Sequence, residues 1–512
     1  TNGKVVVYNA ALSTETLLGT VTGSHATWGD YYNNYIYVFG TGASKNDVTR
    51  IGPLNTLPYD GQSGNFTVGL TVTGGSSGAT GVIVADSDSG ATGTLTLSNI
   101  TGLFTDNETI TDTSTGAAAV NRTFASLFTN AYWTSTLSKT ALTNTLYPTL
   151  RSVRMPNHVS KVHGDGSLYF LDFANGQGLV HRIHTTKTTN EGDTDDTVVP
   201  SLYNALDLPV GFYPTCIEGY GTSLMIGGIY TVDTTTNQGQ SAFVLWDPTN
   251  TISFYLGPVF LPDPLCTALK NSNGILNIWT GNASNGVRLS RYLGGESVQD
   301  VIYQEEGLPP FAGAVDALGN RVVWGGFTTY PTTGSAVWAW GSKDSRLPAG
   351  LHHIAKGSGA GTSPNVTSLK YVQQSSNIAP QLVIASRDGS GYQVDKYSTT
   401  GTLTSKLRWL FNLGVAGYIE RIMIPLAGTV GSTTSITPTI YLDNLSTSIS
   451  PTVINNSNYS GKKKIVYKGT ELKNSQFSNW FSLDFLWGST GPTPLAFPIT
   501  IDIDIFEDEK VA

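Results

Sequence analysis

The stretch Ser223-Leu224-Met225-Ile226-Gly227-Gly228 decides the predicted fold, because versions of it return along most of the chain. Each version is a short run of apolar or aromatic residues that follows a polar turn and ends in small or polar residues. Short apolar runs bounded by turn residues are typical of β-strands. The other copies occupy residues 35–40, 167–172, 275–280, 321–326 and 381–386.

The copies recur at the spacing of a β-propeller. From Tyr169 to Met225, Ile278, Val323 and Val383 the steps are 56, 53, 45 and 60 residues. A four-stranded propeller blade takes roughly 40 to 50 residues, to which outer loops add. We therefore predict an all-β chain built on a β-propeller of about six blades.

The composition supports an all-β class. The chain has 512 residues with 57 Gly and 23 Pro, and only 13% of its residues are charged. Helical periodicity is almost absent, so many short strands and tight turns are expected. A hydrophobic fraction of 39%, with 10 Trp, 24 Tyr and 19 Phe, is enough to bury a sizeable core.

Two parts of the chain depart from the repeat. The step from Tyr37 to Tyr169 is too long for one blade, and within it Ser-Gly-Ala-Thr-Gly occurs at 77–81 and again at 89–93. Residues 100–110 then alternate as a half-buried strand pair does, so we predict an inserted small β-barrel or sandwich. After Ser398 the strands lengthen. The predicted division is 1–59 and 124–400 for the propeller, 60–123 for the inserted β-domain and 401–512 for a C-terminal antiparallel β-sandwich.

The charge balance argues against a surface that wraps nucleic acid. The formal net charge is -8 and the charges form no long blocks, whereas such a surface needs clustered Lys and Arg. The one basic run, Lys462-Lys463-Lys464, is interpreted as a solvated turn; contact with phosphate or another acidic partner is the alternative.

Two cysteines cannot form a disulfide framework. Cys216 and Cys266 stand at matching places before the apolar strands of neighbouring blades, which predicts buried free thiols on inner strands. Whether they pair stays open. No window of 18 uncharged apolar residues occurs, so no membrane span is expected, and whether the chain is complete at Thr1 also stays open.

Carboxylates near the inner strands are the candidates for catalysis. In propeller glycosidases acids stand where inner strands meet the channel, which points to Asp172, Glu218, Asp263 and Asp316. Nothing singles out two of them as proton donor and nucleophile. Ser386-Arg387-Asp388-Gly389-Ser390-Gly391-Tyr392 only approximates the turn of a sialidase, and the common nucleophile, phosphate and zinc motifs do not occur. We expect no enzyme and assign no catalytic residue.

Metal and sugar sites have weaker signals. His181 and His184 would lie on opposite faces of a strand, which is unsuited to a shared metal, so no metal or cofactor is assigned. The loop from Glu191 to Asp196 carries four carboxylates, and whether it binds calcium stays open. Trp133, Tyr330 and Trp340 are candidates for stacking on sugars, although most aromatic residues in such repeats belong to the core.

The inserted segment resembles a β-module of tailed-bacteriophage virion proteins. The resemblance lies in Gly74-Gly75-Ser76-Ser77-Gly78-Ala79-Thr80-Gly81, in Ser89-Gly90-Ala91-Thr92-Gly93-Thr94-Leu95, and in Gly102-Leu103-Phe104-Thr105-Asp106-Asn107-Glu108-Thr109-Ile110. The rest of the chain resembles, in its organisation, the propeller-bearing tail nozzle (tail knob) proteins of short-tailed phages. That resemblance implies a virion location, a homohexameric ring, contacts with the tail adaptor and tail fibres, and passage of double-stranded DNA without specific binding.

The expected function is therefore that of a structural subunit of a phage tail. Its nozzle ring would form the distal DNA exit channel and support host attachment and genome ejection. Two alternatives remain: a tail-tip or spike protein that binds host glycan, and a propeller hydrolase acting on surface polysaccharide.

Overall fold

A computed structural model of the chain describes most of its strands. The described residues are 4–8, 15–20, 25–41, 48–121, 125–127, 158–174, 177–184, 202–233, 238–248, 255–281, 286–295, 298–304, 309–328, 334–341, 350–356, 365–373, 379–388, 391–397, 406–426, 430–442, 444–472, 478–487 and 499–505. The chain divides into two compact units, Thr1–Pro258 and Val259–Ala512, and each is described by itself.

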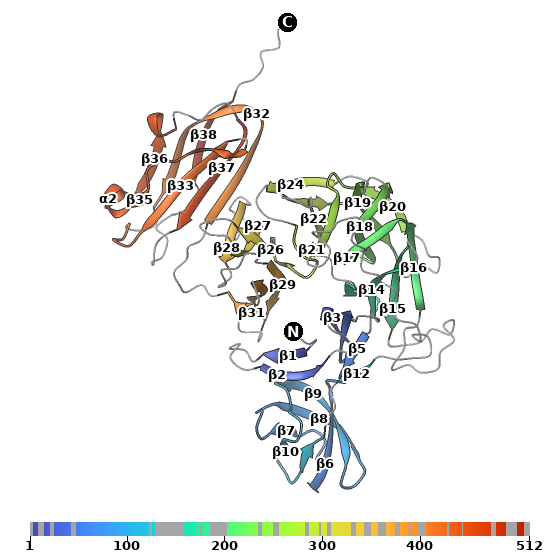
Figure 1. The fold of residues 1–512 in the computed structure, drawn as a ribbon. Helices are drawn as coiled ribbons and strands as arrows, with labels where there is room; N and C mark the ends of the chain where they lie inside the picture. Colours follow the sequence, from blue (N-terminus) through green and yellow to red (C-terminus); the bar gives the residue numbers. More distant parts are fainter. Residues whose placement is uncertain are drawn as a thin grey trace. The chain divides into compact units, whose positions relative to one another are not determined.

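Unit 1 contains three propeller blades in its described residues, each an antiparallel sheet (Figure 1). A hairpin of β1 (Lys4–Tyr8) and β2 (Glu15–Thr20) precedes them. The first blade is β3 (His25–Tyr32), β4 (Tyr35–Thr41), β5 (Val48–Ile51) and β12 (Ala125–Leu127). The second is β13 (Ser160–Val162), β14 (Ser167–Ala174), β15 (Gln177–His184) and β16 (Leu202–Val210), and the third is β17 (Phe212–Tyr220), β18 (Ser223–Asp233), β19 (Gln238–Trp246) and β20 (Tyr255–Phe260).

Unit 2 carries three more blades among its described residues. The fourth is β21 (Leu265–Ser272), β22 (Ile275–Gly281), β23 (Val287–Tyr292) and β24 (Val298–Gln304). The fifth is β25 (Val315–Leu318), β26 (Arg321–Thr328), β27 (Gly334–Gly341) and β28 (Gly350–Lys356), and the sixth is β29 (Asn365–Val372), β30 (Gln381–Asp388) and β31 (Gly391–Lys396). The predicted propeller of about six blades is confirmed.

Turn residues and buried side chains both stabilise the blades. In the third and fourth blades the second strand carries the repeat and is almost wholly buried. A tight turn joins it to the first strand. Asn273 and Gly274 both have positive φ, the conformation that a two-residue hairpin turn requires and that Asn and Gly tolerate. Within unit 2 the fully buried Trp279 and Trp324 bring neighbouring blades together, with ring centroids 6.0 Å apart.

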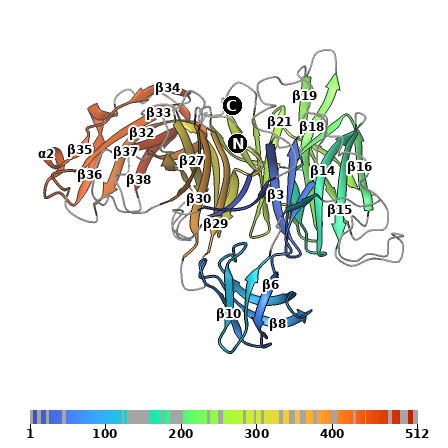
Figure 2. The same ribbon diagram turned by 60° about the horizontal axis from the view of Figure 1, so that its bottom comes forward.

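The insertion is a closed β-barrel (Figure 2). Its strands are β6 (Thr56–Gly64), β7 (Thr71–Gly74), β8 (Thr80–Asp88), β9 (Gly93–Thr101), β10 (Thr109–Asp112) and β11 (Ala117–Val120), and their order around the barrel is β10-β11-β6-β9-β8-β7. The Ser-Gly-Ala-Thr-Gly copies lie at the starts of β8 and β9, as the pattern predicts. Residues 102–108, by contrast, form a loop between β9 and β10 instead of continuing a strand pair.

That loop is held by one buried carboxylate. Glu108, 4% exposed, accepts backbone N–H groups from Ser76 (3.2 Å), Ser77 (2.9 Å) and Thr105 (2.5 Å), and the hydroxyls of Ser76 (3.1 Å) and Ser77 (2.8 Å). Burial alone would raise the pKa of Glu108, but these hydrogen bonds outweigh it and hold the pKa below its ordinary value. Glu108 thus joins the segment around Ser76 and Ser77 to the loop around Thr105.

Replacing Glu108 by Gln should loosen the barrel, because an amide cannot accept five hydrogen bonds as an anion does. We expect a loss of about 2 kcal/mol in the free energy of opening, measured by hydrogen exchange of amides in 56–120 of the full chain at pH 7. The folded pKa of Glu108 lies below the unfolded one, so its stabilisation is complete above the unfolded pKa and is lost as pH falls through the folded pKa. The difference between the two proteins should therefore begin to shrink below about pH 4 and vanish only below the folded pKa of Glu108.

The exposed Asp106→Asn in the same loop is the matched control and should leave exchange unchanged. Equal exchange of Glu108→Gln and the native chain at pH 7 would show that the carboxylate does not hold the loop.

The C-terminal part of unit 2 is an antiparallel β-sandwich built on the long strand β32 (Lys406–Pro425). The first half of β32 pairs with β37 (Ser478–Trp487), and the second half pairs with β36 (Lys464–Lys468) and β38 (Thr500–Ile505). The remaining strands are β33 (Ser435–Leu442), β34 (Asn444–Ile449) and β35 (Ile454–Asn455).

The sandwich is continuous with the fifth blade, although the sequence suggests a separate sheet. Leu351 and His352 of β28 pair with Arg408 and Leu407 of β32. Backbone hydrogen bonds therefore join the two parts directly.

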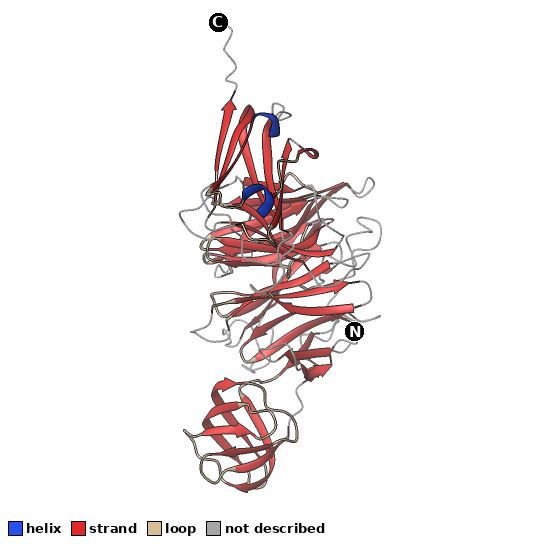
Figure 3. Ribbon diagram, turned by 90° about the vertical axis from the view of Figure 1, so that its left-hand side faces the viewer, coloured by secondary structure: helices blue, strands red, loops and turns tan. Residues whose placement is uncertain are grey.

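Helix is nearly absent among the described residues (Figure 3). It is confined there to α2 (Asn456–Tyr459) and the short 3-10 helix η1 (Gly469–Glu471). No helix in this part of the chain has the length and apolar character needed to cross a membrane.

Candidate functional site

One position on the innermost strand of every blade carries a charge. This charged residue pairs with the third residue of each repeat copy on the second strand: Tyr37, Tyr169, Met225, Asn277, Val323 or Val383. In chain order the charged residues are Asp30, Lys161, Glu218, Lys270, Asp316 and Lys370. Acid and lysine alternate from blade to blade.

Backbone irregularities place this position. A β-bulge interrupts the first strand pair of four blades, before Trp28, Cys216, Ala268 and Ser368, and the charged residue follows each bulge by two residues. A bulge re-aims the side chains beyond it. The charged side chain therefore leaves each of these strands at an equivalent point.

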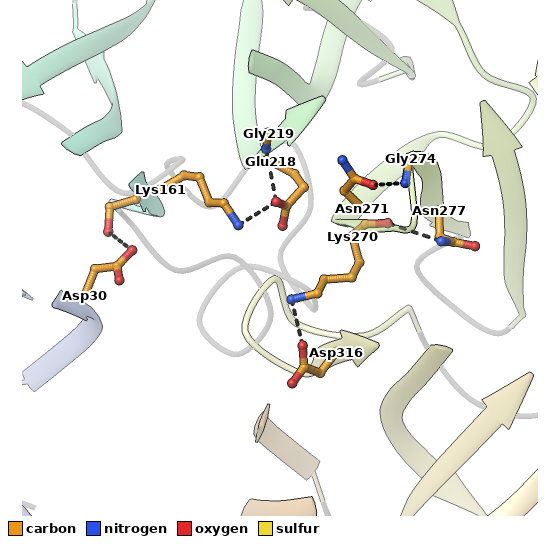
Figure 4. A network of polar contacts seen from close by, with 10 residues as sticks. Asp30, Lys161, Glu218, Gly219, Lys270, Asn271, Gly274, Asn277 and Asp316 are labelled. Atoms are coloured by element: carbon orange, nitrogen blue, oxygen red, sulfur yellow. Dashed lines mark hydrogen bonds and ion pairs between the residues drawn. The ribbon is translucent and has the colours of Figure 1, made fainter. Parts of the chain in front are cut away.

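In unit 1 these charged side chains contact residues of neighbouring blades (Figure 4). The Lys161 ammonium lies 2.5 Å from Glu218 Oε1, which also accepts the Gly219 N–H at 3.0 Å. The Lys161 side chain is 31% exposed and that of Glu218 only 10%. Asp30 accepts the Ser160 hydroxyl at 3.3 Å. Two carboxylates and one ammonium thus come from three successive blades.

Unit 2 repeats the arrangement. Lys270 of the fourth blade lies 2.6 Å from Asp316 Oδ1 of the fifth, and Asp316 Oδ2 accepts the Tyr371 N–H of the sixth blade at 2.7 Å. Figure 4 shows the Lys270 side chain reaching toward Asp316. Such charge-assisted hydrogen bonds are stronger than neutral ones.

Removing the lysine should cost more than removing the whole pair. Lys161→Met leaves the nearly buried Glu218 carboxylate without its ammonium, and we expect a loss of about 2 kcal/mol in unfolding free energy, less than for a fully buried pair because Lys161 is partly solvated. The double variant Lys161→Met, Glu218→Met should regain part of this loss. Urea unfolding followed by tryptophan fluorescence measures both, and a double variant no more stable than the single one contradicts the account.

Two of the four acids predicted from the sequence occupy this inner position, and two do not. Glu218 and Asp316 do. Asp263 precedes β21 and accepts hydrogen bonds from Thr280 (2.6 Å) and Arg288 (2.7 Å). It therefore fixes its own blade.

Asp172 is a buried structural carboxylate on the second strand β14. It is 2% exposed and accepts from His181 Nε2 at 3.2 Å and from the Phe173 N–H at 2.8 Å. Burial would raise its pKa, but the His181 hydrogen bond and the nearby His158 and His181 outweigh this and lower it. The Asp172 carboxylate therefore stabilises the second blade and is removed from solvent.

The other residues singled out in the sequence either have a structural role or lie outside the described residues. Cys216 and Cys266 are buried free thiols on the first strands β17 and β21, as expected. Trp340 of the fifth blade is half-buried, and the Arg291 guanidinium of the fourth blade stacks over its ring at 4.1 Å. Trp340 therefore contributes to packing between these two blades. Trp133, Tyr330 and the loop from Glu191 to Asp196 lie outside the described residues, as does the His184 side chain.

Sequence reasoning missed Asp30 and the three lysines. The available signal was the repeat itself: aligning each copy on its second strand places a charged residue at one shared position of the strand before it. The alternation is visible only when lysines and acids are aligned together. Among the described residues no group of three or more His, Cys, Asp or Glu could hold a metal ion.

Known proteins resemble this chain only distantly. No protein-family model matches the chain, and no curated protein matches it. Among solved structures, Trypanosoma rangeli sialidase in complex with sialic acid is 8% identical and covers 98% of this chain and 94% of its own, with a TM-score of 0.35. The GH43 BlXynB protein from Bacillus licheniformis is 9% identical, covering 69% and 98%, with a TM-score of 0.26.

A xylan beta-1,4-xylosidase from Bacillus halodurans C-125 is 10% identical, covering 71% of this chain and 99% of its own, with a TM-score of 0.24. These values assign neither activity nor substrate to this chain. The expectation that the chain is no enzyme is nevertheless corrected, because the sialidase and the xylosidase named here are enzymes.

Proposed function

We propose that the chain acts on host-surface glycan as part of a bacteriophage virion, and that the inner-strand charges of unit 1 bind and hydrolyse the polysaccharide. The observation that carries the proposal is the pair of carboxylates on either side of Lys161, Asp30 and Glu218, at one shared position of the first and third blades. Glycoside hydrolysis needs two carboxylates with different roles.

The two carboxylates meet different partners. Glu218 contacts an ammonium and so suits the charged role of nucleophile or base. Asp30, which accepts from the neutral Ser160 hydroxyl and Tyr31 N–H, is the acid left for proton donation. Lys161, 31% exposed, can donate to sugar hydroxyls from between them. Separate surroundings for two acids are how one fold performs both acid and base chemistry.

The test is release of reducing ends from a panel of bacterial surface polysaccharides by the full chain. Glu218→Gln keeps an acceptor for Lys161 while removing the charge, and Asp30→Asn removes the proposed proton donor. Each should lower kcat by about 100-fold or more.

Asp106→Asn in the barrel is the control and should retain full activity. Glycan retention without any release would support the binding role alone. A chain that neither binds nor cleaves any polysaccharide, or whose Glu218→Gln variant cleaves as the native chain does, contradicts the proposal.

A second candidate is a tail nozzle ring subunit that contacts the adaptor and fibres and surrounds the passing DNA. The observation that favours it is the inserted barrel, whose virion-like motif closes as one unit around Glu108. A barrel projecting from a blade is a device for contacts with other subunits, and rings of identical subunits need such heterologous surfaces.

Light scattering of the purified full chain, with electron-microscope class averages, tests this candidate. A closed sixfold ring of about six times the 54.5 kDa chain mass is expected. A monomer that stays monomeric when mixed with the adaptor contradicts it.

A further inference from the structure

The three-stranded sheet β36-β32-β38 of the sandwich has oppositely charged edges. Among the described residues, β36 and β38 each pair with β32 alone, so no described strand covers the outer edge of either. Both run antiparallel to β32 and are therefore parallel to each other. A sheet with two open edges can be extended by another copy of itself.

The β36 edge is basic. Lys464 and Lys468 are exposed at its two ends, while Ile465 and Tyr467 between them point into the core. The run Lys462-Lys463-Lys464 leads into the strand, and Lys462 lies over the Tyr459 ring at 5.1 Å. None of these lysines has an ion pair within the part of the chain that the structure describes.

The β38 edge is acidic on its outer side and incompletely covered on its inner side. Asp504 is exposed and Asp502 pairs with Arg421 at 2.6 Å. Ile499, Ile501 and Ile503 pack against the core but stay only half-buried. Further apolar surface would be removed from water if another strand covered this edge.

The register of the sheet aligns the two edges. Arg421 of β32 pairs with Lys468 on one side and with Asp502 on the other, so Lys468, Arg421 and Asp502 form one row across the outer face. In a head-to-tail neighbour the same row begins again with its Lys468, next to Asp502. Opposite charges directly across a strand pair are stabilising.

We propose that β38 of one copy pairs in parallel with β36 of a second copy, with Asp502 opposite Lys468. Asp504 and Lys464 lie on the same outer face and add further opposite charge to the two edges. The pairing uses two different edges and is therefore heterologous, which closes into a ring or extends as a filament. The inference rests on the second candidate above, self-assembly of the chain, and is independent of glycan hydrolysis.

Two other accounts of the lysines make different predictions. Lysines on an edge strand can simply prevent sheet-to-sheet association, and a phosphate polymer could bind them. Under either account the acidic edge of β38 plays no part, and substitutions there would leave assembly unchanged.

The experiment exchanges charges between edges and mixes the products. One full-length variant carries Lys464→Glu and Lys468→Glu, and the other carries Asp502→Lys and Asp504→Lys. Each alone sets like charges against each other, and should need at least about tenfold higher concentration to assemble in light scattering. An equimolar mixture should recover native assembly, because every interface then joins opposite charges.

The neutral pairs Lys464→Gln, Lys468→Gln and Asp502→Asn, Asp504→Asn serve as milder variants, and thermal unfolding confirms that each chain folds. Failure of the mixture to recover assembly, or native-like assembly of either reversed variant alone, overturns the edge interface while ring assembly itself stands. A native chain that never assembles, with adaptor present, overturns both.

Discussion

Face-to-face burial of side chains between successive blades is the interaction on which the rest of the structure depends. A single blade is a small sheet that cannot bury both its faces, so each must pack on a neighbour. In unit 1 Phe39 of the first blade meets Phe170 of the second, with centroids 5.1 Å apart. In unit 2 Trp279 and Trp324 do the same between the fourth and fifth blades. This packing sets the register in which the inner strands meet.

The charged inner positions follow from that register. With the apolar faces packed, lysine and carboxylate reach across to the next blade at the innermost strand, where Lys161 meets Glu218 and Lys270 meets Asp316. Partly buried pairs of this kind add little net stability but penalise a wrong partner. In the proposed function the same groups supply the acids and the cation of a glycan site, so one position would serve both structure and function.

The barrel and the sandwich extend the propeller in different ways. The barrel closes its sheet on itself and removes its strand edges, with Glu108 holding the loop that completes it. The sandwich pairs its long strand β32 with the fifth blade, and within the described part of the chain β36 and β38 have no pairing partner besides β32. A closed barrel has no strand edge to pair, whereas the edge of an open sheet can form backbone hydrogen bonds with another strand.

The sequence by itself determined the all-β class, the repeat, the inserted module and several strands, including residues 435–442 of β33, because alternation and turn residues are local signals. It also identified Glu218 and Asp316 among four acids. Only the tertiary structure separated them from Asp172 and Asp263, because burial and hydrogen-bond partners depend on strand pairing. The roles of Asp30, the lysines and Glu108 needed that pairing too. Ser77 lies 31 residues from Glu108 and Ser160 lies 130 from Asp30, and no local pattern records such contacts.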